Sequence, residues 1–496
     1  MELLDWIVVG LFFLVMLVIG GWSFSKVKDT SDFFVAGGKL PWWLSGISHH
    51  VSGYSGAVFV GYAALAYTQG ISIYFWWALT IAFGTFVGAF FLAPRWAQLR
   101  IRHNIQSPTE YLLLRYNLPT QQLMAWSGVL LKLFDVGAKW AAIGVLLQVF
   151  TGMPLITGIL LSGGISLVYI TVGGLWADVW TDFAQFVVQI LAGLVILGAV
   201  LMALGGLPAL WEVWDRLPVQ NSQVFTEAYP AGFALAFLFI NFLSYNGGTW
   251  NLATRYISSP SGASARKAAL LSAALYLLWP LVLFFPMWVA PLLLPGLEDP
   301  SQSYGLLTRQ FLPAGLVGLV LASMFANTMS MTSSDANTVA SFLTRDILPT
   351  LSGRFRQGDK RQSLVVARAA TFVFTAITLL IAIQAGSFGG VLGLIINWFG
   401  ALLGPVAIPM LLGLLPTFRH SDSRAAITSI LGGFAAFVFT RYGLEEMPQV
   451  VQVASPVGVS FLLYVGMGWL NRRKEVKKEV DMLHASLREE EKEVVV

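Results

Sequence analysis

The sequence predicts an all-α, polytopic membrane protein with about 13 transmembrane helices and two inverted five-helix repeats. The composition gives the class, because 56% of the 496 residues are hydrophobic and only 11% are charged. Soluble domains contain about 25% charged residues. Long apolar segments recur along the whole chain, and two of them are interrupted by Gly and polar residues. Such interruptions inside a membrane are tolerated only where the freed backbone groups face protein, water or a ligand.

The predicted spans are long enough to cross a bilayer, which takes about 20 mostly apolar residues. They cover approximately residues 3–24, 41–68, 72–99, 121–150, 153–172, 174–204, 231–256, 266–293, 313–345, 363–385, 388–416, 424–440 and 454–471. No small-residue cleavage pattern follows the first span, so we expect it to be retained rather than removed as a signal peptide.

Basic residues are distributed unevenly between alternate loops. One set of loops contains most of the Lys and Arg residues, Arg255 among them, whereas the opposite set contains only Arg216, Arg309 and Arg441. Lys and Arg are enriched in cytoplasmic loops. The pattern therefore predicts a multi-pass protein of the cell membrane with its N-terminus outside and its C-terminus in the cytoplasm.

The second and seventh spans are the interrupted ones. Residues 48–56 read SHHVSGYSG, and residues 244–251 read SYNGGTWN. The two breaks lie five spans apart, which is expected if spans 2–6 and 7–11 are inverted repeats that each begin with a discontinuous helix. The alternative is that both are ordinary glycine packing notches. The repeat reading divides the chain into an N-terminal helix and loop (1–40), a first repeat (41–204), a second repeat with its preceding outer loop (205–416), two C-terminal helices (417–473) and a charged tail (474–496).

The ninth span contains an unusual number of hydroxyl side chains between residues 324 and 346. Ser330, Ser333, Ser334 and Asn337 fall on one face if this segment is helical. Their oxygens suit a small hard cation, because such cations prefer oxygen ligands. A polar seam between two membrane helices is the alternative.

Four motifs occur in order along the chain: DFFVAGGKLPWW at 32–43, SPTEY at 107–111, GGLWADVWTD at 173–182, and the segment from Asn337 to Asp346. Together they resemble the sodium/solute symporter family, which includes sodium–glucose, sodium–proline and sodium–sialic acid carriers. The resemblance covers nearly the whole chain. It implies a LeuT-like fold and sodium-driven uptake of a small organic solute by alternating access.

The resemblance also implies positions for sodium. One ion would lie between the first break and the hydroxyl-rich helix, held by the backbone carbonyls of Ser48 and Val51 together with Asn327 and Ser330. Met331 departs from the Ser or Thr that the family has, and a thioether is a poor ligand for a hard cation. That site has therefore lost one oxygen unless Asn327 or Thr328 replaces it.

A second pattern in the family would place sodium at Asp182 with Ser330, Ser333 and Ser334. An ionised carboxylate inside a bilayer needs a partner, and sodium would neutralise it. The alternative is that Asp182 pairs with an Arg or with a helix N-terminus. Asp178 lies one turn earlier on the same face, nearer the cytoplasmic end, and we expect it to be solvated.

Candidate solute-binding residues cluster around the two breaks and on the fourth and eleventh spans. They are His49, His50, Ser55, Asp135, Lys139, Tyr245, Trp250, Asn251 and Asn397. No known substrate pattern of the family is matched. Neutral His, Asn and aromatic side chains favour a sugar or polyol, and a small carboxylate or amino acid met by Lys139 is the alternative.

The fourth span allows another interpretation. Lys132, Asp135 and Lys139 share one helical face, so they form either an internal ladder of salt bridges or a solute contact. Asp335 has no counterpart in the family pattern. It either adds negative charge to the ion path or pairs with a Lys of another helix.

Several function classes are excluded. The sequence has no nucleotide-binding loop, no H-E-x-x-H and no G-x-S-x-G motif, so we expect no enzyme. Without cysteine it has no disulfide, and nothing indicates a metal other than sodium, a nucleic-acid partner or an obligatory protein partner. A proton-coupled or uncoupled carrier remains the alternative. The oxygen ligand lost at Met331 keeps this alternative open. His49 and His50 also keep it open, because His changes charge near neutral pH.

Overall fold

Helices form every regular element in the residues that the computed structural model describes, which are 1–355, 360–385, 404–443, 447 and 449–488. The longer helices are α1 (Leu3–Phe24), α3 (Trp42–Val51), α5 (Leu79–Phe91), α6 (Ala93–His103), α8 (Leu118–Thr151), α9 (Leu155–Ala203), α11 (Ala231–Leu243), α13 (Gly262–Trp288), α15 (Ser303–Phe311), α16 (Leu316–Ser341), α18 (Lys360–Ile383), α20 (Ser423–Val438), α21 (Gln449–Leu470) and α22 (Lys478–Ser486). Shorter helices connect them: α2 (Thr30–Val35), α4 (Ala63–Gln69), α7 (Leu112–Arg115), α10 (Ala209–Glu212), α12 (Asn251–Ile257), α14 (Ala290–Leu293) and α17 (Leu348–Leu351).

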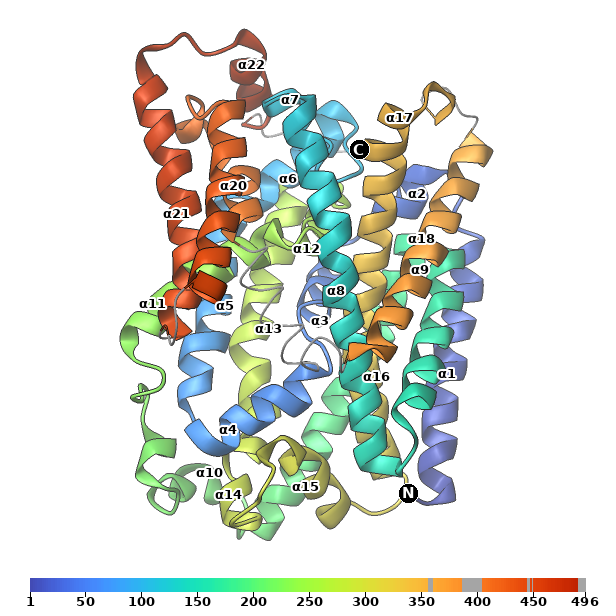
Figure 1. The fold of residues 1–496 in the computed structure, drawn as a ribbon. Coiled ribbons are helices and arrows are strands. Elements are labelled where there is room, and N and C mark those ends of the chain that lie inside the picture. The colour runs from blue at the N-terminus through green and yellow to red at the C-terminus, as the bar shows by residue number, and fades with distance from the viewer. Residues whose placement is uncertain (356–359, 386–403, 444–446, 448, 489–496) are drawn as a thin grey trace.

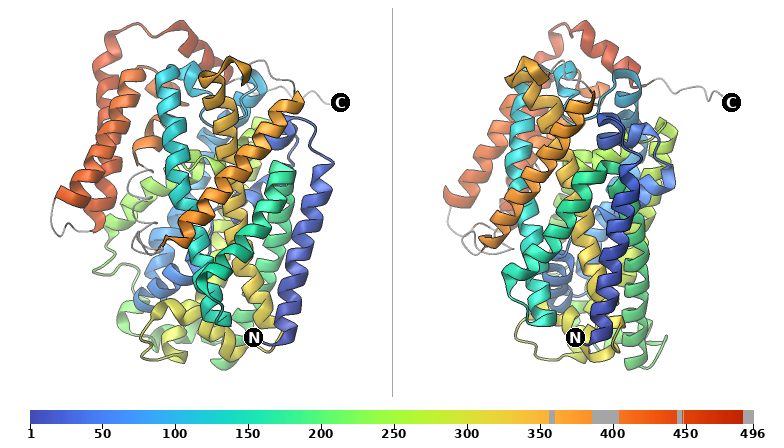
Figure 2. Two further views of the ribbon diagram at one scale, coloured as in Figure 1. Left: turned by 45° about the vertical axis from the view of Figure 1, so that its right-hand side comes forward. Right: turned by 90° about the vertical axis from the view of Figure 1, so that its right-hand side faces the viewer.

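The helices form one bundle with two distinct ends (Figure 1). Residue 1, α10, α14 and α15 lie at one end, which we call the N-terminal end. The short helices α7, α17 and α22 lie at the other, which we call the tail end. Helices α20 and α21 pack together on one flank, while α1 packs along α9 on the opposite flank (Figure 2).

Several helices are apolar enough for a bilayer. Eight helices in the described part of the chain have the length and composition to cross a membrane. The predicted first span coincides with α1. Part of the predicted eleventh span, with Asn397, lies outside the described residues. The number of 13 transmembrane helices therefore stays a prediction.

The predicted boundary between the fifth and sixth spans is a sharp turn at Gly174, where φ is 52° and ψ is −146°. Both ends of α9 lie at the N-terminal end of the bundle, one beside the end of α8 and the other before α10, so the two halves of α9 run in opposite directions (Figure 1). A side chain on Gly174 would collide with Phe33, and its positive φ is one that L-residues rarely adopt. Glycine at this position therefore lets the chain reverse direction beside α2.

Both predicted breaks are present. Helix α3 ends at Val51 and the chain resumes as a π-helical turn at Val58–Tyr62, followed by α4. Helix α11 passes into an irregular turn at Ser244–Gly248, where Gly247 has φ 114°, before α12 begins. Helices α3 and α12 lie near the centre of the bundle in Figure 1. Interrupted helices therefore lie where the sequence predicts them.

One buried carboxylate joins α1 to the start of α16. Asp5 accepts hydrogen bonds from the backbone N–H groups of Gly315 at 2.7 Å and Gly318 at 2.9 Å. The first N–H groups of a helix lack intrahelical partners and favour negative charge. Asp5 therefore fixes the N-terminal end of α16, which carries the hydroxyl side chains.

Candidate ion and solute site

The hydroxyl-rich face of α16 lies against two acidic residues of α9. Helix α16 packs along α9, and α3 packs against the same stretch of α9. Asp178 and Asp182 are one turn apart on α9, so both carboxylates face the same side. Serines of α16 and of the first break surround them. This group of side chains is called the acidic cluster below, and it consists of Ser48, Ser52, Asp178, Asp182, Arg255, Ser330, Ser333 and Ser334.

Asp182 is completely buried in the acidic cluster. Ser48 Oγ donates to its Oδ2 at 2.5 Å, and Ser52 Oγ donates to the same atom at 3.3 Å. Its other oxygen, Oδ1, has no hydrogen-bond partner among the described residues. A buried carboxylate oxygen without a partner costs free energy. Asp182 Oδ1 is therefore a place where a cation or a proton would be stabilised.

Asp178 is buried as well, with no exposed surface. Ser333 Oγ donates to its Oδ1, and Ser334 Oγ donates to its Oδ2 at 2.9 Å. Arg255 Nη2 donates to Oδ2 at 2.6 Å. The expectation of a solvated Asp178 is thus wrong, because a buried arginine on another helix balances its charge.

Arg255 lies in the middle of the acidic cluster rather than in a loop, where the charge distribution of the sequence placed it. Its Nη2 is 3.3 Å from Asp182 Oδ2 and 3.1 Å from Ser52 Oγ. The alternative in which Asp182 pairs with an arginine is therefore confirmed. With both carboxyl groups ionised, the described side chains of the cluster carry a net charge of −1, from Asp178, Asp182 and Arg255.

The remaining predicted sodium ligands lie in this cluster or along the first break. Ser330 Oγ is 3.3 Å from Ser52 Oγ, so it belongs to the cluster. The carbonyls of Ser48 and Val51 accept turn hydrogen bonds from Ser52 N at 2.9 Å and Tyr54 N at 3.3 Å. Those carbonyls therefore point along the first break.

On α16, the two candidate replacements for the oxygen lost at Met331 behave differently. Asn327 Nδ2 donates to Ser323 O within its own helix at 2.8 Å. Thr328 Oγ1 accepts from the backbone N–H of Gly56 at 3.0 Å. Thr328 is thus the side chain that joins α16 to the end of the first break.

A second buried charge cluster joins α8 to α16, and we call it the paired cluster. Lys132 Nζ is 3.0 Å from Asp135 Oδ2 and 2.6 Å from Asp335 Oδ1. Lys139 Nζ is 2.7 Å from Asp135 Oδ2 and 2.7 Å from Asp335 Oδ2. Each amine therefore contacts both carboxylates, and the four charges sum to zero. The internal salt-bridge ladder is confirmed, with Asp335 as its partner on the other helix.

Both ring nitrogens of His49 have hydrogen-bond partners within the protein. Its Nε2 lies 2.9 Å from the carbonyl oxygen of Tyr245 and its Nδ1 lies 2.7 Å from Ser272 Oγ. A carbonyl only accepts, so Nε2 carries the proton and Nδ1 accepts from the serine hydroxyl. Tyr256 Oη also contacts Nε2 at 2.9 Å. His49 therefore links the first broken helix to the second.

His50 has a different environment. It is completely buried between the rings of Tyr54, Tyr276 and Phe186, with centroid distances of 5.0, 4.7 and 6.1 Å. Neither of its ring nitrogens has a hydrogen-bond partner in the described part of the chain, and the same is true of Tyr54 Oη. Donors and acceptors without partners therefore gather beside the first break.

The other solute candidates are scattered. Tyr245 Oη donates to Gly53 O at 3.2 Å, which joins the two breaks. Trp250 instead packs on Phe342 at 5.6 Å between centroids. The side-chain atoms of Asn251 have no partner among the described residues. Ser55 is partly exposed, and Asn397 lies outside the described residues.

Three residues of this region were missed at the level of the sequence: Ser52, Arg255 and Tyr276. Tyr276 Oη donates to the carbonyls of His49 and His50 at 3.0 and 3.1 Å, which holds the end of α3. An arginine near the end of an apolar segment is a functional candidate in a membrane protein. That signal was available for Arg255. Nothing in the sequence places Tyr276 beside the first break.

Two of the sequence motifs meet at the tail end. Ser107 Oγ and Thr109 Oγ1 donate to Asp346 Oδ2 at 2.5 and 2.7 Å, and Gln121 Nε2 donates to Oδ1 at 2.7 Å. Arg345 pairs with Glu110 at 2.6 Å. These contacts therefore join the segment between α6 and α7, and the start of α8, to the turn that follows α16, and they lie outside the acidic cluster.

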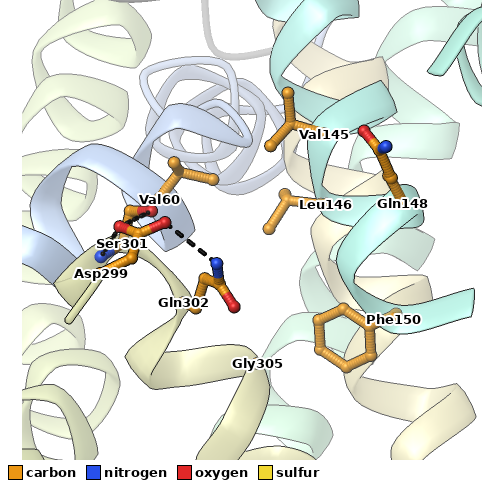
Figure 3. A pocket seen from close by; sticks show the side chains of 9 residues that line it. All are labelled: Val60, Val145, Leu146, Gln148, Phe150, Asp299, Ser301, Gln302 and Gly305. Atoms are coloured by element: carbon orange, nitrogen blue, oxygen red, sulfur yellow. Dashed lines mark hydrogen bonds between the residues drawn. The ribbon is translucent and has the colours of Figure 1, made fainter. Parts of the chain in front are cut away.

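A cavity of about 280 Å³ lies between the first interrupted helix, α8 and the segment before α15 (Figure 3). Val60 of the first interrupted helix lines one side, and Gln148 and Phe150 of α8 line another. Asp299 and Gln302 line the third side, where Gln302 Nε2 donates to Asp299 Oδ2 at 3.0 Å. Val60 lies four residues after Gly56, so the cavity adjoins the first break.

A family model described as the sodium:solute symporter family matches residues 33–440. The chain belongs to this family. Its coupling ion is therefore sodium, and its function is secondary transport rather than catalysis. The sodium:solute symporter family was the one indicated by the sequence motifs.

Individual relatives agree with this membership. The chain is 26% identical to a sodium/glucose cotransporter of Vibrio parahaemolyticus, over 91% of this chain and 88% of the relative. It is 24% identical to the sodium/sialic acid symporter SiaT of Proteus mirabilis, over 87% of this chain and 88% of the relative.

A solved structure has the same fold. The substrate-bound, outward-open state of a Na⁺-coupled sialic acid symporter matches with a TM-score of 0.81 at 21% identity, over 95% of this chain and 98% of that chain. The prediction of an all-α membrane protein with the LeuT-like fold is thereby confirmed.

Proposed function

We propose that this symporter carries a small neutral hydroxylated solute, a sugar or polyol, into the cell together with sodium, and that sodium binds the acidic cluster. The observation that carries the proposal is Asp182 Oδ1, a buried carboxylate oxygen without a partner among the described residues. The net charge of −1 supports it, because one monovalent cation makes the cluster neutral. Serine and carboxylate oxygens are the ligands that a hard cation prefers.

The sodium ligands in this proposal are the oxygens of Asp182, Ser330, Ser333 and Ser334, with Ser48 beside them. A second ion position at the carbonyls of Ser48 and Val51 is supported by the contact between Thr328 and Gly56, which brings α16 against the break. Asn327 would have to leave its bond to Ser323 to join that position.

The solute in this proposal binds between the two breaks. The nitrogens of His50 and the hydroxyl of Tyr54, which have no partner among the described residues, support a ligand that both donates and accepts hydrogen bonds. Tyr245 and Tyr276 supply apolar ring faces beside them, with their ring centroids 5.1 Å apart. Hydroxyl groups on a ring match both features.

A neutral solute is favoured over a carboxylate for an electrostatic reason. A carboxylate needs a cationic partner, but Lys139 already contacts two carboxylates in the paired cluster. Arg255 is likewise engaged by the acidic cluster. Recruiting either side chain would leave a buried carboxylate without its counter-charge, which is strongly unfavourable.

Transport in this proposal follows alternating access between two inverted repeats, residues 41–204 and 205–416. Sodium binding draws together the first break, α9 and α16, and the solute then closes the site between the breaks. The uneven distribution of Lys and Arg supports an N-terminus outside the cell and a tail in the cytoplasm. The cavity beside Val60 is then the outer approach to the solute.

The alternative coupling ion is a proton. A proton on Asp182 would also neutralise the cluster and satisfy the unpartnered oxygen. The experiment is uptake into proteoliposomes of the purified chain, with an inward gradient of either sodium or protons. The panel contains neutral sugars, polyols, sugar acids, small carboxylates and amino acids.

We expect a sodium gradient to drive uptake of a neutral sugar or polyol, and choline in place of sodium to remove it. Uptake driven by a proton gradient in sodium-free buffer would contradict sodium coupling. Sodium-driven uptake confined to a carboxylate would contradict the neutral solute.

A further inference from the structure

One nitrogen of Arg255 is surrounded by more oxygens than it has hydrogens. Its Nη2 lies 2.6 Å from Asp178 Oδ2, 3.1 Å from Ser52 Oγ and 3.3 Å from Asp182 Oδ2, and it also contacts Ser334 Oγ. A guanidinium Nη carries two hydrogens in a fixed plane. Four converging oxygens therefore exceed what it can bond, whereas a spherical cation has no such limit.

The rest of the guanidinium is poorly satisfied. Arg255 is completely buried, yet its Nε has no hydrogen-bond partner in the described part of the chain. Its Nη1 donates to Thr254 Oγ1 of the same helix at 3.2 Å. An unpaired buried donor costs free energy. The arginine therefore fills a position whose oxygens suit a cation, without meeting its own hydrogen-bonding needs.

We propose that Arg255 is an internal cation that competes with sodium for the acidic cluster and so sets the sodium affinity of the carrier. This inference rests on the proposed sodium site. When sodium enters, the guanidinium withdraws from Asp182 and Ser52 and keeps Asp178, its shortest carboxylate contact. Asp182, Ser52 and Ser330 then have free oxygens for the ion.

The competition links ion occupancy to the second broken helix. Arg255 lies on α12, directly after the second break, whereas its partners lie on α9, α16 and the first break. After sodium leaves, the guanidinium returns to Asp182 and balances part of its charge. The empty carrier can then reorient without an exposed pair of carboxylates. Net uptake depends on this return, but exchange of solute with sodium present on both sides does not.

The experiment is a sodium titration of the melting temperature of the purified full chain, with choline keeping the ionic strength constant. Ligand that binds only the folded state raises the melting temperature, so the titration gives the half-saturating sodium concentration. Arg255→Gln removes the competitor and is expected to lower that concentration at least about tenfold. Asp178→Asn frees the guanidinium to pair with Asp182 and is expected to raise it about tenfold.

The opposite signs of these two variants separate competition from a structural role. Thr254→Val is the matched control, because it touches Arg255 without changing a charge, and its half-saturation should stay within about twofold of the wild type. Arg255→Gln is also expected to retain solute exchange while losing net uptake. If Arg255→Gln does not fold, an unchanged or lowered half-saturating sodium concentration in Asp178→Asn would still contradict the competition.

Two results would overturn the competition. One is an unchanged half-saturation in both variants, and the other is a shift of both in the same direction. A fall in melting temperature that is equal in sodium and choline would assign Arg255 a structural role only. Loss of the sodium response in Asp182→Asn, with no shift in Arg255→Gln, would overturn the competition but keep the sodium site. No sodium response in the wild type would overturn both.

Discussion

The two buried charge clusters of this symporter share one helix, α16. They differ in how completely their charges are paired. Ser334 belongs to the acidic cluster and the next residue, Asp335, belongs to the paired cluster. The paired cluster is neutral and each amine contacts both carboxylates. The acidic cluster has a net charge of −1, and Asp182 Oδ1 has no partner among the described residues.

The clusters also differ in the helices that they connect. In the paired cluster, the ion pairs of Asp335 with Lys132 and Lys139 join α8 to α16. The acidic cluster joins α9 and α16 to the ends of both interrupted helices, through Ser48, Ser52 and Arg255. An incomplete cluster between elements that can move suits a transported ion, whereas a complete one suits a rigid support. Burial of charge alone therefore does not identify an ion site; the missing partner does.

The largest expected effect comes from removing the carboxylate charge of Asp182 in the acidic cluster. Asp182→Asn removes the charge that sodium would neutralise, and we expect sodium-driven uptake to fall at least about 100-fold, because charge interactions are strong in a buried site. Uptake into proteoliposomes measures it. Glu227→Gln, an exposed carboxylate on the loop before α11, is the control and should behave as the wild type. Unaltered sodium-driven uptake in Asp182→Asn would show that the ion binds elsewhere.

A second variant breaks the paired cluster instead. Asp335→Asn leaves two lysines with one carboxylate, and an uncompensated buried charge lowers the free energy of unfolding by about 3–5 kcal/mol. Thermal or denaturant unfolding measures this loss, which should be the same in sodium and in choline. Adding Lys132→Met restores neutrality and should recover part of the stability. A loss seen only in sodium would place Asp335 on the ion path.

A smaller effect comes from removing one neutral oxygen of the acidic cluster. Ser330→Ala should raise the half-saturating sodium concentration about tenfold, the equivalent of one lost contact to a charged group. Thr332→Val is the control on the same helix, because Thr332 Oγ1 donates to Thr328 O of its own helix at 2.8 Å. Equal shifts in both variants would indicate a general effect on α16 rather than a sodium ligand.

The smallest expected effect concerns the C-terminal tail, and it should be independent of both charge clusters. Burial is the main reason that the pKa of His484 on α22 falls to about 4, from 6.5. Its Nε2 donates to Gly413 O at 3.0 Å. Neutral His484 therefore stabilises the docked tail above pH 6.5, and this stabilisation is lost as the pH falls towards 4.

Hydrogen exchange of residues 478–486 measures that docking. Protection should decline between pH 6.5 and pH 4 in the wild type, and His484→Gln should remove this dependence while keeping the sodium response. A pH-independent protection in the wild type would contradict the assignment of His484 as the titrating group.

Local sequence patterns predicted most of the fold. Composition identified the membrane class, and glycines with polar neighbours identified both interrupted helices. The extent of α1 also follows from its apolar run. The boundary at residue 173 was also predicted, because a glycine pair interrupts the apolar run there. The close approach of Phe33, which requires glycine at position 174, could not be predicted from the sequence.

The site was predicted less completely, because charge pairing depends on contacts between distant segments. Asp182 and the serines of α16 could be named from motif positions. Asp178 was expected to be solvated, since its partner Arg255 is 77 residues away in the chain. Similarly, Asp335 had two interpretations until Lys132 and Lys139 were found beside it.

The central claim is that sodium binds the acidic cluster, and direct binding of radioactive sodium tests it. The proteins compared are the wild type, Asp182→Asn, and the double variant Lys132→Met with Asp335→Asn, in which the paired cluster stays neutral. We expect saturable binding with similar affinity in the wild type and in the Lys132→Met, Asp335→Asn double variant, and loss of that binding in Asp182→Asn. Retained binding in Asp182→Asn, with loss in the double variant, would contradict the claim and assign sodium to the paired cluster.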